Sequence, residues 1–239
     1  MQRDEFQTGV IKPVEIYKES WELIRDQYWL VFAVTLVGML IGGAVPIFLI
    51  GPMMCGIYLC LFEKIEGRPV NFDLLFKGFE YFVPSLIVAV VIMVPILLLL
   101  ITVYVPIIGM AIAGPRMSES EMIPFFIGTF IFEFVVVVIM VCFHTLLMFA
   151  FPLIVDRKLS GWQAMKVSAK AVWNNLAGVA GLFGVGFLVG IVGYMALCVG
   201  FYLVIPLIIT SNAVAFRKIF PPLSPGALNP PPPTEYQGV

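Results

Sequence analysis

The stretch YWLVFAVTLVGMLIGGAVPIFLIGPMMCGIYLCLF, residues Tyr28–Phe62, runs for 35 residues without a single Asp, Glu, Lys or Arg. A helix needs about 20 apolar residues to cross the roughly 30 Å hydrocarbon core of a bilayer, so this stretch is too long for one span. Its middle carries Gly42-Gly43 and Pro46, residues that interrupt helices. The stretch therefore predicts a tight hairpin of two membrane spans.

Three further stretches are almost free of charge, and only Glu133 interrupts them: Tyr81–Pro115, Met122–Val155 and Ala171–Phe216. Hydrophobic residues make up 61% of the chain and charged residues 12%, against about 45–50% and about 25% in soluble domains. The composition predicts an all-α, polytopic membrane protein with six transmembrane helices. The two middle stretches are expected to be single long spans, and the hairpin spans are expected at about 28–45, 48–63, 175–194 and 197–216.

The basic residues give the expected orientation. In the six-span arrangement, thirteen of the 14 Lys and Arg residues fall on one side and Arg116 falls alone on the other. Basic loops stay in the cytoplasm, so both termini are expected there. An eight-span arrangement, with each middle stretch folded as a hairpin, keeps the same parity at the termini. However, it moves Arg116 inside and places Glu133 at a turn without turn residues, so six spans fit better.

Three short segments with one apolar stripe each, at 13–27, 71–82 and 161–173, precede the pairs of spans. We expect them to be amphipathic helices that lie in the cytoplasmic headgroup layer. The alternative is that they simply extend the following spans. Their candidate interfacial anchors are Tyr17, Trp21, Phe76, Phe79 and Trp162.

The same pattern predicts an internal repeat of three units, each with one interfacial helix and two spans. The units are about 13–66, 70–156 and 160–220, after a polar N-terminal segment at 1–12. That N-terminal segment lacks the basic-then-apolar order of a cleaved signal peptide, so the first span is expected to remain. The Pro-rich stretch 221–239 is expected to be a disordered cytoplasmic tail. Within it, Pro230, Pro231, Pro232, Pro233 and Tyr236 are a candidate partner-binding motif, with a plain spacer as the alternative.

Two polar residues inside the spans form a candidate intramembrane site, Glu133 and His144. They are eleven residues apart, which is about three helical turns and roughly 16 Å along one helix face. An acid and an imidazole on one face are typical of a proton or cation relay. The alternative is that Glu133 lies near the outer interface and His144 bonds a neighbouring helix.

Other chemistry finds no support in the sequence. The four cysteines form no CxxC pair, and no HExxH, GxSxG or phosphate-binding loop is present. We therefore expect no catalytic residues, no metal site and no cofactor. A net charge of −1 without a basic stripe also argues against a nucleic-acid partner.

The segment FPLIVDRKLSGWQAMKVSAKAVWNNL, followed by a Gly-rich span, an IPLI helix and AFRKIF, resembles a broad bacterial family of uncharacterised integral membrane proteins. That family is related to the membrane domain of some glycerophosphodiester phosphodiesterases. The resemblance is clearest over roughly 145–220 and weaker over 12–80. The matching positions are Pro152, Asp156, Arg157, Ala164, Ser168, Asn175, Pro206 and Arg217. It implies a six-helix module of the bacterial cytoplasmic (inner) membrane, and without a phosphodiesterase domain it implies no such activity.

The sequence is compatible with three functions. The first is a non-enzymatic membrane module that binds a protein or lipid partner, as a scaffold, an anchor or a factor in envelope homeostasis. The second is a small transporter or channel that uses Glu133 and His144. The third is a membrane-embedded lipid enzyme, whose only candidate cluster is Asp156, Arg157, Asn174 and Asn175.

Overall fold

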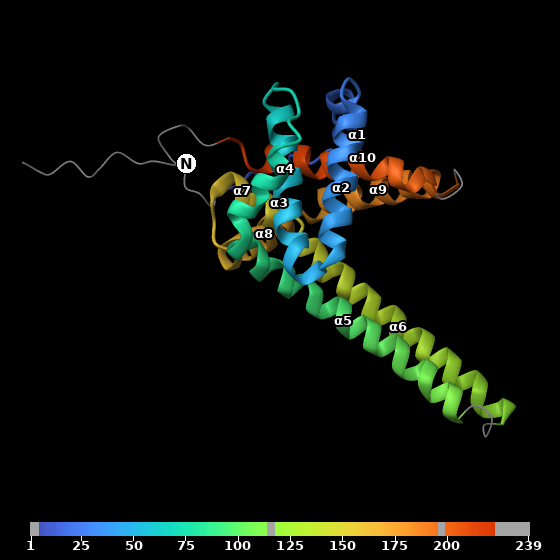
Figure 1. The fold of residues 1–239 in the computed structure, drawn as a ribbon. Coiled ribbons are helices and arrows are strands. Elements are labelled where there is room, and N and C mark those ends of the chain that lie inside the picture. Colours follow the sequence, from blue (N-terminus) through green and yellow to red (C-terminus); the bar gives the residue numbers. More distant parts are fainter. Residues whose placement is uncertain (1–4, 114–117, 196–198, 223–239) are drawn as a thin grey trace, which may run out of the picture.

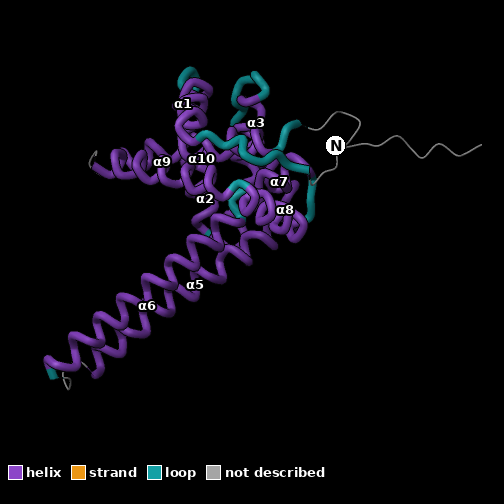
Figure 2. Tube along the Cα trace, turned by 180° about the vertical axis from the view of Figure 1, so that it is seen from behind, coloured by secondary structure: helices purple, strands orange, loops and turns teal. Residues whose placement is uncertain are grey.

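The computed structural model describes residues 5–113, 118–195 and 199–222, and this part of the chain is helical without any strand (Figures 1 and 2). The helices are α1 (Pro13–Ile24), α2 (Tyr28–Ala44), α3 (Pro46–Ile65), α4 (Leu74–Lys77), the 3₁₀ turn η1 (Gly78–Tyr81), α5 (Phe82–Ala113), α6 (Glu119–Leu146), α7 (Ala150–Arg157), α8 (Gly161–Asn174), α9 (Leu176–Met195) and α10 (Val199–Ile219).

Five helical segments are long and apolar enough to cross a membrane, or six if α1 and α2 together count as one bent span. The five are Pro46–Ile65, Leu74–Ile112, Ser120–Arg157, Leu176–Met195 and Gly200–Ile219. The expected multi-span, all-α architecture is therefore confirmed. The first expected span, α2, has 17 residues, slightly short of a full crossing when it stands alone.

The short helices before the spans behave differently from one another. The axis of α1 turns through 103° before α2, so α1 is not an extension of that span. By contrast, α4 and η1 run directly into α5 as one helical segment of 39 residues. Pro84 lies just after the 3₁₀ turn, and the helical segment continues through it. For 71–82, the structure thus follows the alternative in which the short helix extends the span.

A break near residue 148 divides the third apolar stretch, Met122–Val155, into α6 and α7. Ser168 of α8 forms hydrogen bonds with the backbone on both sides of this break. Its hydroxyl donates to the carbonyl of Leu146 at 2.7 Å and accepts from the N–H of Phe149 at 3.1 Å. The chain can therefore turn inside the protein without leaving buried backbone groups unbonded.

The packed core lies at one end of the spans, where the C-terminal halves of α3 and α10 meet α7 and α8. Its largest fully buried side chains include Tyr58, Phe149, Leu153, Phe216 and Phe220. The lengths of α5, α6 and α9 are mostly exposed apolar surface, as expected for helices that face lipid. Figures 1 and 2 show α5 and α6 side by side, projecting from this body as a long hairpin.

Helix α3 packs unusually closely on α4 and η1 because two glycines lie at the contact. A Cβ atom on Gly56 would lie 2.0 Å from the carbonyl oxygen of Leu75, and a Cβ on Gly78 would lie 2.0 Å from that of Pro52. No side chain fits at either position. These glycines let the backbones touch, as small residues do between membrane helices.

Candidate functional site

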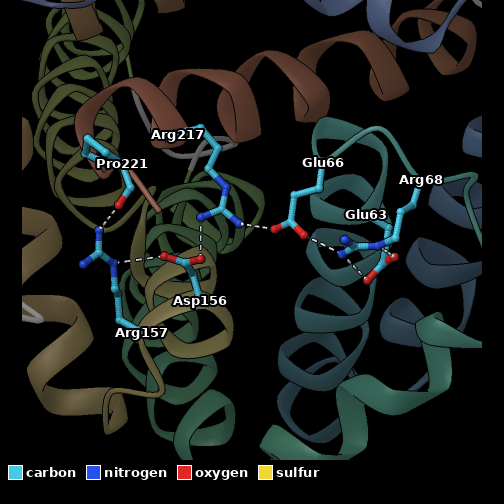
Figure 3. Close-up of polar contacts among 7 residues, drawn as sticks. All are labelled: Glu63, Glu66, Arg68, Asp156, Arg157, Arg217 and Pro221. Atoms are coloured by element: carbon cyan, nitrogen blue, oxygen red, sulfur yellow. Dashed lines mark hydrogen bonds and ion pairs between the residues drawn. The ribbon is translucent and has the colours of Figure 1, made fainter. Parts of the chain in front are cut away.

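Six charged residues at the ends of α3, α7 and α10 form one connected cluster, which we call the charged junction (Figure 3): Glu63, Glu66, Arg68, Asp156, Arg157 and Arg217. Arg217 is at its centre. Its Nη1 donates to Oδ1 of Asp156 at 2.5 Å, and its Nη2 donates to Oε1 of Glu66 at 3.2 Å. One guanidinium therefore joins the ends of three helices.

Arg157 is the most deeply buried charge of the junction, with 1% of its side chain exposed. Its Nε donates to Oδ2 of Asp156 at 3.0 Å, and its Nη2 donates to the carbonyl oxygen of Pro221 at 2.6 Å. Pro221 is the first residue of the Pro-rich stretch. The junction thus holds Pro221 next to the end of α7.

Arg68 closes the other end of the junction. It bonds both Glu63 and Glu66, and the Arg68 Nη2 to Glu66 Oε2 distance is 2.5 Å. The hydrogen bond to Glu63, and after it the one to Glu66, raises the pKa of Arg68 above its ordinary value. Arg68 therefore stays protonated, and it supplies a charged hydrogen-bond donor to the carboxylates of both Glu63 and Glu66.

Aromatic rings surround the central guanidinium. The Cζ atom of Arg217 lies 4.2 Å from the ring centroid of Phe62. Phe216 continues the aromatic stack toward Phe220, with ring centroids 4.9 Å apart. Rings attract a cation through their faces, and attraction grows when water is excluded. Aromatic packing at the ends of α3 and α10 therefore shields the ion pairs of Arg217 from water.

Two further ion pairs bring the N-terminal region to the same end of the molecule. Lys218 Nζ lies 2.7 Å from Glu19 of α1, and Lys64 Nζ lies 2.6 Å from Asp26. Together with the junction, these pairs connect four basic segments, 12–25, 64–77, 157–170 and 217–218, which the sequence predicts to share one side of the membrane.

Asn175, between α8 and α9, secures the segment before α1. Its Oδ1 accepts from the N–H of Gly9 at 2.8 Å, and its Nδ2 donates to the carbonyls of Gln7 and Ala171 at 3.1 and 2.9 Å. Asn175 is 5% exposed, so these bonds are made away from solvent. Its neighbour Asn174 is exposed and bonds only the carbonyl of Lys170.

The two candidate intramembrane residues are on α6, but they do not form a joint site. His144 Nδ1 lies 2.8 Å from the carbonyl oxygen of Met140, and Nε2 lies 3.1 Å from that of Ile92 on α5. Both ring nitrogens thus face backbone carbonyls, and the contact with Ile92 is the one expected in the alternative that His144 bonds a neighbouring helix. Glu133 instead lines a cavity between α5 and α6 that does not include His144.

The candidate interfacial anchors divide into two groups. Trp21, Phe76, Phe79 and Trp162 are 41–58% exposed, so they are free to contact the surroundings of the protein. Tyr17 is only 8% exposed, because it packs toward Gly186 of α9 and lines a small cavity beside α10. Tyr17 therefore lies inside the protein in this structure, and its role as an interfacial anchor stays a prediction. The candidate motif Pro230–Pro233 with Tyr236 lies outside the described residues.

Sequence reasoning did not identify the charged junction as a unit. In the sequence, Asp156 and Arg157 are positions of the resemblance and members of the candidate enzyme cluster, Arg217 is a position of the resemblance, and Glu66 has no assigned role. The available signal was the position of each charge directly after an apolar helix. Opposite charges at several such ends favour ion pairs if the ends meet.

Comparisons of the chain with protein-family models, with curated proteins and with solved structures found no match. Within the described residues, no three His, Cys, Asp or Glu side chains come together as metal ligands would. The assignment of function therefore rests on the geometry alone.

Proposed function

We propose that this protein is a non-enzymatic integral membrane module that binds a protein or lipid partner, acting as a scaffold or anchor. The observation that carries this proposal is the Arg157–Pro221 contact within the charged junction. A buried guanidinium holds the start of the Pro-rich stretch at 2.6 Å on a rigid meeting point of three helices. Such an arrangement suits a membrane platform that presents a tail at a fixed place.

The proposal includes an orientation and a location. The four basic segments would face the cytoplasm of a bacterial cell, with the spans in its inner membrane and both termini inside. The ion pairs Glu66–Arg217 and Glu19–Lys218 support a common side for these segments. We also propose that the chain consists of three repeated units and that it is related to the membrane domain of some glycerophosphodiester phosphodiesterases.

Enzymatic chemistry on the membrane surface has little to support it. Asp156 and Arg157 bond each other, Arg217 and Pro221, and Asn175 bonds three backbone groups. A general base or nucleophile must be able to reach substrate. These side chains instead hold the ends of helices, which is why we favour a binding module.

A small transporter or channel is the second candidate, and the position of Glu133 favours it. Its carboxyl group lies inside the α5–α6 hairpin next to a cavity. Against a relay stands His144, since its two ring nitrogens face the backbone carbonyls of Met140 and Ile92 and it does not line the cavity of Glu133. Reconstituted vesicles test this candidate: a proton or cation flux that Glu133→Gln abolishes, with folding intact, would replace the scaffold proposal.

Native mass spectrometry of the protein, extracted gently from its own membrane, tests the scaffold proposal. We would compare the full chain with a variant that ends at Pro222 and with one that carries alanine at Pro230–Pro233 and Tyr236. A stoichiometric protein that is retained by the full chain and lost from both variants identifies the partner. One lipid class retained by all three supports the lipid form of the proposal. A chain that retains neither overturns it.

A further inference from the structure

The cavity between α5 and α6 lies in the half of the hairpin nearer its tip, has a volume of about 500 Å³ and is open on one side, where its lining residue Phe130 is 74% exposed. Small-molecule sites usually enclose about 300–1,000 Å³. Its walls are aromatic and aliphatic, with one ionisable group, and include Pro106, Met110, Phe125, Phe126, Phe130 and Glu133. The cavity is thus of ligand size and carries a single acid.

The carboxyl group of Glu133 has no adequate hydrogen-bond partner among the described residues. Its Oε1 is buried and has none. Its Oε2 lies 3.4 Å from the hydroxyl of Thr102, but that hydroxyl also lies 2.9 Å from the carbonyl of Leu99. A hydroxyl has one proton to donate, and the closer acceptor takes it. A carboxylate left this way in an apolar region is costly.

The chemistry of the walls restricts what could partner this carboxylate. A metal ion needs several oxygen or nitrogen ligands, and the described lining offers few besides Glu133 and the Thr129 hydroxyl. Three phenyl rings, however, suit a positive charge with apolar substituents, because ring faces attract cations and the apolar groups fill the rest. Such a cation also sheds little hydration when it enters from the membrane.

We propose that this cavity binds a lipophilic organic cation, with Glu133 as counter-ion and Phe125, Phe126 and Phe130 around the apolar groups. The site lies in the membrane-embedded hairpin, away from the charged junction. It does not depend on the scaffold function proposed above, and the tail variants leave it unchanged. The ligand class is defined by one delocalised or shielded positive charge on an apolar body of drug size.

Calorimetric titration of the full chain in lipid nanodiscs with tetraphenylphosphonium tests the proposal, with empty nanodiscs as the blank. We expect saturable binding with one site per chain. Tetraphenylborate, which has the same shape and the opposite charge, should show only the non-saturable partitioning of the blank. Equal saturable binding of both ions would overturn charge recognition by Glu133.

Matched variants separate the site from general effects on the fold. Glu133→Gln keeps the side-chain shape and should weaken binding of the cation by at least about tenfold, since an apolar site makes a lost counter-ion expensive. Glu121→Gln changes an acid of the same helix that does not line the cavity, and it should leave affinity unchanged. Unaltered affinity in Glu133→Gln would refute the proposal.

The aromatic walls are tested in the same way. Phe130→Leu removes a lining ring and should weaken binding several-fold, whereas Phe134→Leu, one turn away and outside the lining, should not. Both side chains are highly exposed, at 74% and 62%, so neither change should disturb the fold. Equal effects of the two changes would also count against the site, as would the absence of any saturable binding.

Discussion

Arg217 and Asp156 are 61 residues apart in the chain, yet Arg217 Nη1 lies 2.5 Å from Oδ1 of Asp156. Their side chains are only 10% and 12% exposed. This pair ties the end of α10 to the end of α7. Since Asp156 also bonds Arg157, one carboxylate balances two buried guanidinium groups.

Asp156→Ala should therefore be strongly destabilising. Breaking a buried pair by removing one partner costs about 3–5 kcal/mol, because a charge is left without compensation. Titration with SDS in mixed micelles, followed by circular dichroism, gives the unfolding free energy. Glu63→Ala is the control, since the Glu63–Arg68 pair is 30% and 52% exposed and should contribute at most about 1 kcal/mol. A loss no larger than that of the control would contradict the central role of Asp156.

The Lys64–Asp26 pair predicts a pH effect. The hydrogen bond from Lys64 lowers the pKa of Asp26 below its ordinary 3.8. Since the folded value is the lower one, the pair stabilises the fold above that ordinary value, and this contribution is lost as the pH falls through the folded pKa. Lys64→Met should return the Asp26 titration upward toward 3.8, as read from ¹³C-labelled aspartate by NMR. Lys12→Met, which breaks only the Lys12–Glu15 pair, should leave that titration in place.

Asn175→Ala should release the segment before α1. The change removes the bonds to Gly9, Gln7 and Ala171 and leaves buried backbone groups without partners. The expected cost is about 1–3 kcal/mol. Hydrogen exchange should show faster exchange of the Gly9 amide. The neighbouring Asn174→Ala, on an exposed side chain, should stay within about 0.5 kcal/mol of the original stability, and similar exchange in both variants would contradict the role of Asn175.

Gly56→Ala should force α3 away from α4. The new Cβ would meet the backbone oxygen of Leu75 at 2.0 Å, and a backbone atom cannot rotate aside as a side chain can. Overpacking of this kind costs about 1–3 kcal/mol or more. Gly43→Ala is the matched helix control, because nothing lies within 4 Å of its Cβ. That control should be neutral or gain about 0.5–1 kcal/mol, measured by the same SDS titration.

The membrane hairpins could be predicted from the sequence because their signal is local. Charge-free length and helix-breaking residues gave spans at 28–45 and 175–194, and the helices are Tyr28–Ala44 and Leu176–Met195. The break between α6 and α7 could not be predicted in this way. It depends on the hydroxyl of Ser168, which comes from another helix.

Helix α1 shows why a periodic pattern is not enough to place side chains. The single apolar stripe of 13–27 predicts one face toward lipid, which includes Tyr17 and Trp21. Trp21 is 48% exposed, but Tyr17 is buried. The buried face also includes Ser20, whose small side chain bonds the carbonyl of Ile16. Which side of α1 is buried is determined by its packing against α9 and α10. The spacing of apolar residues within α1 does not specify these neighbours.

For the candidate sites too, the sequence predicts what is local and does not predict contacts between helices. An acid inside an apolar stretch is visible in sequence, so Glu133 could be identified, but its cavity depends on the pairing of α5 with α6. The charged junction depends on which helix ends meet. No local pattern specifies that Arg217 bonds Glu66 rather than another acid.

The length of the α5–α6 hairpin has a consequence for the membrane itself. Helices of 32 and 28 residues extend about 48 and 42 Å, whereas the hydrocarbon core is about 30 Å thick. A hairpin of this length, with its base packed in the core, has to lean over, thicken the bilayer around it or extend beyond the hydrocarbon, and the mismatch costs a fraction of a kcal/mol per Å. The protein should therefore favour regions of thick bilayer, where its hairpin stands more upright.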